Sequence, residues 1–196
     1  MAAIEQECQR LNRRAYHLLC SAILVPSAEA IGHPPSRAVV KARIEPSAWT
    51  PVNTRYHEQI KPLMAEILDF YSRLDTPLTE AQEARVETLY ARTLRMVEAV
   101  RFGEVLQRSL LRHAAPASPL REAHDDIRLA LAEGLNRLAA NPEAADISAP
   151  IDEVRRHWQQ ALAERLREHR LDPWLASSLM NDLHQAIRLM GALAPA

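Results

Sequence analysis

DPWLASSLMNDLHQAIRLMGAL, residues 172–193, is the stretch that decides the fold class. Its Asp-Pro start is typical of a helix N-cap followed by a proline in the first helical turn. Apolar residues then recur every three or four positions, which places them on one side of a helix; they are Leu175, Leu179, Leu183, Ile187, Met190 and Leu193. We therefore expect an amphipathic helix that packs one face against other helices, with Trp174 as a packing staple at its start.

The same spacing recurs in five further segments and predicts about six helices. They are expected over 3–25, 55–74, 79–113, 118–140 and from Ser148 or Pro150 onward. Their inward positions are Ile4, Cys8, Leu11, Ala15, Leu18, Ala22 and Val25; Tyr56, Ile60, Leu63, Ile67, Phe70 and Leu74; Val86, Leu89, Leu94, Val97, Val100, Val105, Leu106 and Leu110; Ile127, Leu131, Leu135 and Leu138; Ile151, Val154, Trp158, Leu162 and Leu166. Because the breaks after the second helix are short, neighbouring helices must run antiparallel. The fold expected is an all-α, antiparallel up-down helical bundle.

Local signals refine the helix ends. Thr79 and Gln82 have the spacing of a capping box. Pro62 predicts a kink or a later start of its helix, because proline has no N–H to donate. Gly103 indicates a bend or a close contact between helices. Ser118 is expected to cap the fourth helix, with a proline directly after it.

Three regions follow along the chain. Residues 1–25 form an N-terminal helix, residues 26–54 form a proline-punctuated connection, and residues 55–196 form the helical bundle. The first helix has a full apolar stripe, so we expect it to pack in the same domain as the bundle.

Composition excludes several classes of protein. The 24 basic and 25 acidic residues give a net charge of −1, so there is no overall field to attract nucleic acid or an anionic membrane. Cys8 and Cys20 lie on one predicted helix roughly 18 Å apart, which is too far for a disulfide. The apolar run 18–25 is too short to cross a bilayer. Glu5 and Glu7 argue against a signal peptide, and the cytoplasm is the expected location.

No familiar catalytic motif is present. The sequence lacks a zinc-protease motif, a glycine-rich phosphate loop and a nucleophile elbow. These absences exclude motif classes and not enzymes as a whole. We expect a protein that is not an enzyme and that carries no cofactor.

The most suggestive polar cluster is Glu122, His124, Asp125 and Asp126, which is the weak candidate for a metal site. Acidic residues near a helix N-terminus are also stabilised by the helix dipole alone, and this reading is favoured. No metal ligand is assigned on this basis.

Two carboxylate pairs have a spacing of four residues, Glu83 with Glu87 and Glu164 with Glu168. Each pair could hold a hard cation together with a second helix. Arginines flank both pairs, which favours a solvated helix face.

The C-terminal third resembles a known family. Residues 163–171 (AERLREHRL) and 177–183 (SSLMNDL) are similar to the end of the PhoU-like domain that is appended to bacterial sodium/phosphate cotransporter-related proteins. Residues 95–100 (RMVEAV) resemble the Arg-Met-x-Glu centre of the preceding repeat. The resemblance covers roughly residues 57–194 and is best over 163–184.

This resemblance implies a bundle of three-helix repeats with a regulatory or accessory role in phosphate transport. The role would be exerted by protein contact, with a sodium/phosphate transporter membrane domain as partner at the inner face of the membrane. Such domains also bind metal clusters through Glu/Asp-x-x-x-Asp motifs. We assign no such motif here and carry over no metal ligands.

Two alternatives remain open. One is a generic helical adaptor unrelated to phosphate, with the 26–54 connection as its binding segment. The other is a bundle enzyme or carboxylate–metal protein that uses His124, Asp125 and Asp126. In every case long amphipathic helices could also pair two copies into a homodimer.

Overall fold

The structure is a computed structural model that describes residues 2–23, 51–73, 78–113, 118–140, 146–168 and 172–194. Within these residues it contains helices and no strand. The elements are α1 (Ala2–Ile23), α3 (Val52–Arg55), η3 (Tyr56–Ile60), α4 (Lys61–Ser72), α5 (Glu80–Arg112), α6 (Arg121–Ala140), α7 (Ala149–Arg167) and α8 (Pro173–Leu193). Since α3, η3 and α4 follow one another without a break, the described chain forms six long rods, as predicted.

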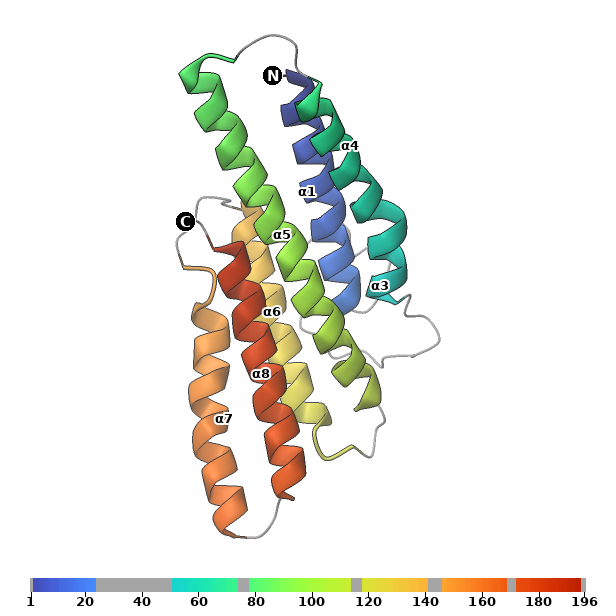
Figure 1. The fold of residues 1–196 in the computed structure, drawn as a ribbon. Helices are drawn as coiled ribbons and strands as arrows, with labels where there is room; N and C mark the ends of the chain where they lie inside the picture. Colours follow the sequence, from blue (N-terminus) through green and yellow to red (C-terminus); the bar gives the residue numbers. More distant parts are fainter. Residues whose placement is uncertain are drawn as a thin grey trace.

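Successive rods run antiparallel, so the protein is an all-α up-down helical bundle (Figure 1). Four helices form its centre, because α1 packs on α5 and α6, and α8 packs on the same two helices. α4 lies outside this centre against α1, while α7 lies outside it against α6 and α8. None of the helices described is both long and apolar enough to cross a membrane.

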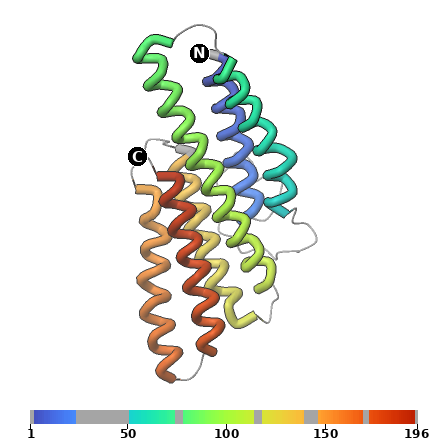
Figure 2. Tube along the Cα trace, viewed as in Figure 1, coloured from blue at the N-terminus to red at the C-terminus, as the bar shows by residue number. Residues whose placement is uncertain are grey.

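The six rods also divide into two successive groups of three. α1, α4 and α5 make up one end of the molecule, and α6, α7 and α8 make up the other (Figure 2). The 33-residue helix α5 belongs to both ends, because its second half extends alongside α8. The end that contains the N-terminus is therefore built from fewer helices than the opposite end.

The structure contains the capping hydrogen bonds that the sequence predicts at three helix starts. The Gln82 side chain accepts a 3.0 Å hydrogen bond from the Thr79 N–H, as a capping box requires. Asp172 caps α8 by accepting a 2.7 Å hydrogen bond from the Trp174 N–H. Ser118 accepts a 3.3 Å hydrogen bond from the Leu120 N–H two residues further on, as an N-cap does, in a turn that leads into α6 at Arg121.

Pro62 has the effect that its missing N–H predicts. α4 starts at Lys61 with Pro62 in its first turn, and the preceding turn, η3, is a π-helix. Pro62 has no N–H to donate to the carbonyl one turn earlier, and the wider π-helical turn leaves room for that unpaired carbonyl.

The second rod starts at Val52, three residues before the predicted start. Its Val52 N–H donates a buried 3.0 Å hydrogen bond to Gln107 Oε1, which attaches α3 to α5. Most of the predicted 26–54 connection lies outside the described residues, as do the predicted inward positions Val25 and Leu74.

Most predicted inward positions are buried or half-buried, but four apolar positions were predicted wrongly. Phe70, Leu94 and Leu166 are 45%, 39% and 36% exposed. Trp174 is 65% exposed and is no staple. Phe70, Leu166 and Trp174 lie within a few residues of a helix end, where neighbouring helices cover less of the side chain. Leu94 lies on a side of α5 that no neighbouring helix covers fully.

Two buried glycines allow helices to approach closely. A Cβ on Gly103 would lie 2.9 Å from Leu19 Cδ2 and 3.7 Å from Leu189 Cδ1, so the side chains of α1 and α8 pack directly on the α5 backbone there. A Cβ on Gly134 would collide with Met190 Cε and lie 2.7 Å from the Ile147 carbonyl oxygen. The predicted alternative of a close helix contact at Gly103 is therefore confirmed.

We predict that Gly134→Ala destabilises the fold by about 1–3 kcal/mol, because a backbone carbonyl cannot move aside as a side chain can. Gly191→Ala is the matched control, since nothing lies within 4 Å of its added Cβ. That control should gain about 0.5 kcal/mol from better helix propensity. Urea unfolding followed by circular dichroism measures both values, and equal effects would contradict the packing described for Gly134.

Candidate functional site

The four candidates from the sequence point in three directions from the start of α6, with Glu122 and Asp126 on the same side. Glu122 is exposed, His124 is buried, and Asp125 and Asp126 are half-buried on separate sides of the helix. Neighbouring positions on a helix are rotated by about 100°, which separates side chains that adjoin in sequence. Among the described residues no group of three or more His, Cys, Asp or Glu side chains is arranged to hold a metal ion.

Glu122 and Asp126 do have the Glu-x-x-x-Asp spacing, which the reading of the sequence overlooked. Asp126 lines a groove of about 630 Å³ between α6 and α7, together with Glu133 and Glu153. Glu133 is held by a 2.9 Å ion pair with Arg137. Three carboxylates, one of them paired with an arginine, thus line this groove together with His157 and Trp158.

His124 belongs to a buried polar cluster that joins three helices. Its Nε2 lies 2.8 Å from Asp182 Oδ2 on α8, and both side chains are at most 4% exposed. Ser109 on α5 donates a 2.6 Å hydrogen bond to the same Asp182 oxygen. A nucleophilic serine is activated by a direct hydrogen bond from its hydroxyl to the imidazole. Here the Asp182 carboxylate lies between the Ser109 hydroxyl and the His124 imidazole. The cluster therefore connects α5, α6 and α8 and does not form a nucleophile–base pair.

A second imidazole, His113, lies against His124 with ring centroids 5.1 Å apart. Its Nδ1 lies 3.4 Å from Ser118 Oγ. Burial lowers the pKa of His113, and the neighbouring His124 and Arg112 lower it further, while Asp182 opposes them. The environment thus favours the neutral form of this imidazole.

Asp182 and His113 were not predicted as site residues. The nearby His184 is exposed and points away from the buried Asp182. A usable signal was present, because Asp182 adjoins the apolar stripe of α8 between Leu179 and Leu183. A carboxylate at such a position needs a buried partner.

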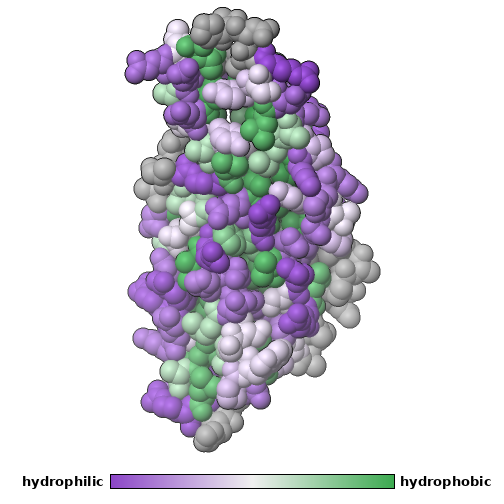
Figure 3. Space-filling view, in the orientation of Figure 1, coloured by the Kyte–Doolittle hydropathy of each residue, from purple (hydrophilic) through white to green (hydrophobic). Residues whose placement is uncertain are grey.

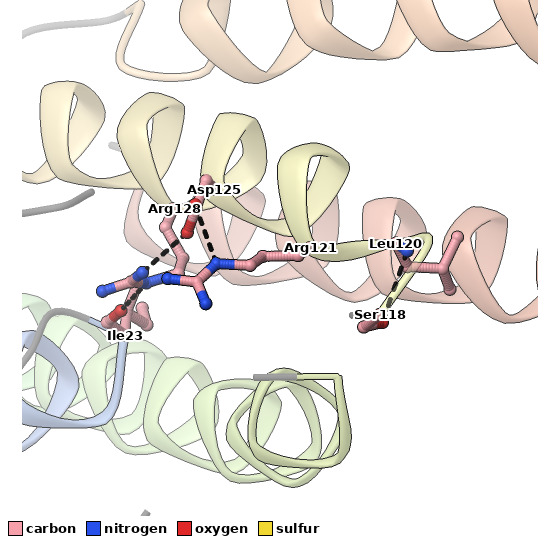
Figure 4. A network of polar contacts seen from close by, with 6 residues as sticks. All are labelled: Ile23, Ser118, Leu120, Arg121, Asp125 and Arg128. Atoms are coloured by element: carbon pink, nitrogen blue, oxygen red, sulfur yellow. Dashed lines mark hydrogen bonds and ion pairs between the residues drawn. The ribbon is translucent and has the colours of Figure 1, made fainter. Parts of the chain in front are cut away.

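Arg128 connects α6 to the end of α1 (Figure 4). Its guanidinium is fully buried and donates 2.9 Å hydrogen bonds to the Ile23 carbonyl oxygen and to Asp125 Oδ1. Arg121 Nε lies 4.0 Å from the other Asp125 oxygen. Burial lowers the pKa of Arg128, and Asp125 opposes this shift. Asp125 thus serves a structural ion pair, and Arg128 caps the last carbonyls of α1.

An apolar groove opens at the other end of the molecule, between α4 and α5 and above α1. Its cavity measures about 250 Å³ and is lined by Ile4, Cys8, Ile67, Leu68, Tyr71, Val86, Glu87 and Tyr90. We call it the α4–α5 groove. Figure 3 shows the corresponding apolar surface in green in the upper part of the molecule.

The chemistry of the α4–α5 groove suits an apolar ligand group. Leu68 and Tyr71 are each 46% exposed at its edge. Cys8 is buried, and burial raises the pKa of its thiol, so the sulfur presents an uncharged surface. Concave apolar sites with a few polar groups at the edge are typical of binding sites.

We predict that Arg128→Met lowers the free energy of unfolding by about 3 kcal/mol, because it leaves Asp125 and the Ile23 carbonyl without their buried donor. Arg137→Met is the matched control, since Arg137 also lies on α6 and also forms a 2.9 Å ion pair, but at the surface. That control should change stability by less than about 1 kcal/mol. Urea unfolding measures both, and a similar small loss in each would show that Arg128 does not hold α1 to α6.

Comparison with protein-family models, curated proteins and solved structures finds no match for this chain. The resemblance of residues 163–184 to the PhoU-like domain therefore stays a prediction.

Proposed function

We propose that the chain is a non-catalytic, PhoU-like regulatory domain that acts on phosphate transport through contact with a transporter membrane domain. The observation that carries this proposal is the division of the bundle into two successive groups of three helices, α1/α4/α5 and α6/α7/α8. Three-helix repeats are what the C-terminal resemblance implies, so the architecture supports the same family from independent features.

The residues that carry the resemblance lie where a repeat would need them. Residues 163–167 end α7, and residues 177–183 form the first half of α8. Within the second stretch Leu179, Asp182 and Leu183 are buried, and Asp182 bonds His124 and Ser109. Leu179, Asp182 and Leu183 therefore maintain the packing of α8, whereas residues 163–167 are exposed on α7.

Protein contact is the mode of action that the surface favours. The α4–α5 groove presents Leu68 and Tyr71 to solvent beside an apolar cavity. The proposal places this surface at the cytoplasmic side of the membrane, where the transporter domain would reach it. A homodimer is part of the proposal as a second use of long amphipathic helices.

A second candidate is a helical adaptor unrelated to phosphate. The α4–α5 groove also supports the adaptor function, because an exposed apolar cleft indicates that a partner binds but does not identify that partner. The identity of the bound protein separates the two functions.

Photo-crosslinking in the native host tests the proposal. The chain would carry a benzophenone amino acid at Phe70, which is 45% exposed on α4, the helix that forms one wall of the groove. We expect a sodium/phosphate transporter membrane subunit in the crosslinked product, and altered phosphate uptake when the chain is deleted. The same probe at Leu166 on α7 is the control and should not yield that product. A reproducible non-transporter partner with unchanged phosphate uptake would contradict the proposal and support the adaptor.

A further inference from the structure

The side of α5 that lines the α4–α5 groove carries further residues before and after the cavity. Glu83, Glu87, Tyr90 and Leu94 succeed one another at intervals of three or four residues, so they lie on one side of α5. Glu87 and Tyr90 line the cavity itself, and Leu94 is 39% exposed. From Glu83 to Leu94 this edge is about 16 Å long, which is three helical turns.

Helices bound the groove on three sides and leave the fourth side open. α1 supplies its floor through Ile4 and Cys8, α4 supplies one wall, and α5 supplies the other. Where α5 passes α8 at the other end of the molecule, a helix covers it. The α8 helix ends beside Arg95, whose Nη1 donates a 3.1 Å hydrogen bond to the Ala194 carbonyl oxygen. A further helix could lie in the open groove and bury Leu68, Tyr71 and Leu94.

The charge at the edge of the groove indicates what such a helix would carry. Glu83 and Glu87, one of the carboxylate pairs noted in the sequence, are both exposed on the α5 wall. Arg85 does not neutralise them, because its guanidinium pairs with Glu5 on α1. A bound helix therefore meets apolar surface along its centre and two carboxylates along one side.

We propose that the α4–α5 groove binds an amphipathic, basic helix of a partner protein, with aliphatic anchors in the groove and Lys or Arg against Glu83 and Glu87. Helix-in-groove recognition uses anchors at i, i+3 or i+4 and i+7, which matches three turns of wall. This inference rests on the proposed function by protein contact and names the chemistry of the segment that is bound.

The probe is a synthetic 18-residue helix with Leu at i, i+4, i+7 and i+11, Ala elsewhere in the centre, and Lys on both flanks. A second peptide replaces every Lys with Glu. Fluorescence anisotropy of a labelled peptide with the full chain measures binding. We expect the Lys peptide to bind, the Glu peptide to bind at least about tenfold more weakly, and the difference to shrink in high salt.

Two variants separate the apolar and charged parts of the site. Leu68→Glu with Tyr71→Glu should weaken binding of the Lys peptide about tenfold or more, since it places charge in the anchor site. Glu83→Lys with Glu87→Lys should reverse the preference, so that the Glu peptide binds better. This second variant changes exposed side chains only and keeps the test meaningful if the first variant fails to fold.

The matched controls lie on α7, away from the groove. Leu166→Glu, and separately Glu164→Lys with Glu168→Lys, make the same kinds of change and should leave the preference for the Lys peptide unchanged. Equal binding of the two peptides, no reversal in the charge-swapped variant, or equal losses in the controls would overturn the inference. A homodimer that dissociates when Leu68 and Tyr71 are replaced would also overturn it, because a second copy would then occupy the groove.

The outcome is distinguishable from that of the proposed function. If the transporter crosslink persists in the Leu68→Glu, Tyr71→Glu variant, the groove inference fails while regulation of transport stands. If the basic peptide binds as expected but no transporter is crosslinked, the groove inference stands and the adaptor function replaces the transport function.

Discussion

The structure depends on the close passage of α5 between α1 and α8. At Gly103 the end of the Leu19 side chain from α1 occupies the space that a Cβ would need, and Leu189 from α8 lies within contact distance of the same point. Because α5 is 33 residues long, it extends beyond this crossing into a part of the molecule that α8 does not reach. One half of α5 is therefore enclosed by helices, while the other half lies on α1 and forms a wall of the α4–α5 groove. The enclosed core and the open groove are two consequences of the same packing.

Buried polar contacts hold the second group of helices to this centre. Arg128 links α6 to the end of α1, and Asp182 links α8 to α6 and α5 through His124 and Ser109. Such groups are costly to bury alone and are stable only with their partners in place. They favour one particular alignment of helices, which apolar stripes alone would specify less strictly. His124 and Asp125, two members of the polar cluster noted in the sequence, thus maintain the architecture. The apolar α4–α5 groove lies at the opposite end of the molecule.

Local features of the sequence predicted the fold well, because helix periodicity and capping act over one or two turns. The rods, their antiparallel order and the caps at Thr79 and Asp172 follow from such signals. Exposure of Leu94 and Trp174 did not follow, since it depends on how far a neighbouring helix extends. The partner of His124 is 58 residues away in sequence, and no local pattern indicates which helix provides it. The α4–α5 groove was likewise absent from the sequence reading, because it forms where three separate helices meet.

Amide hydrogen exchange along α5, read by mass spectrometry, tests the central claim most directly. Exchange of a helix amide reports the free energy of the opening that exposes it. Residues 96–110, enclosed by α1 and α8, should exchange only through global unfolding, whereas residues 83–94, beside the groove, should exchange through smaller local openings and therefore faster. Equal protection along the whole of α5, or stronger protection of residues 83–94, would contradict an account in which one half of this helix is enclosed and the other half lies beside an open groove.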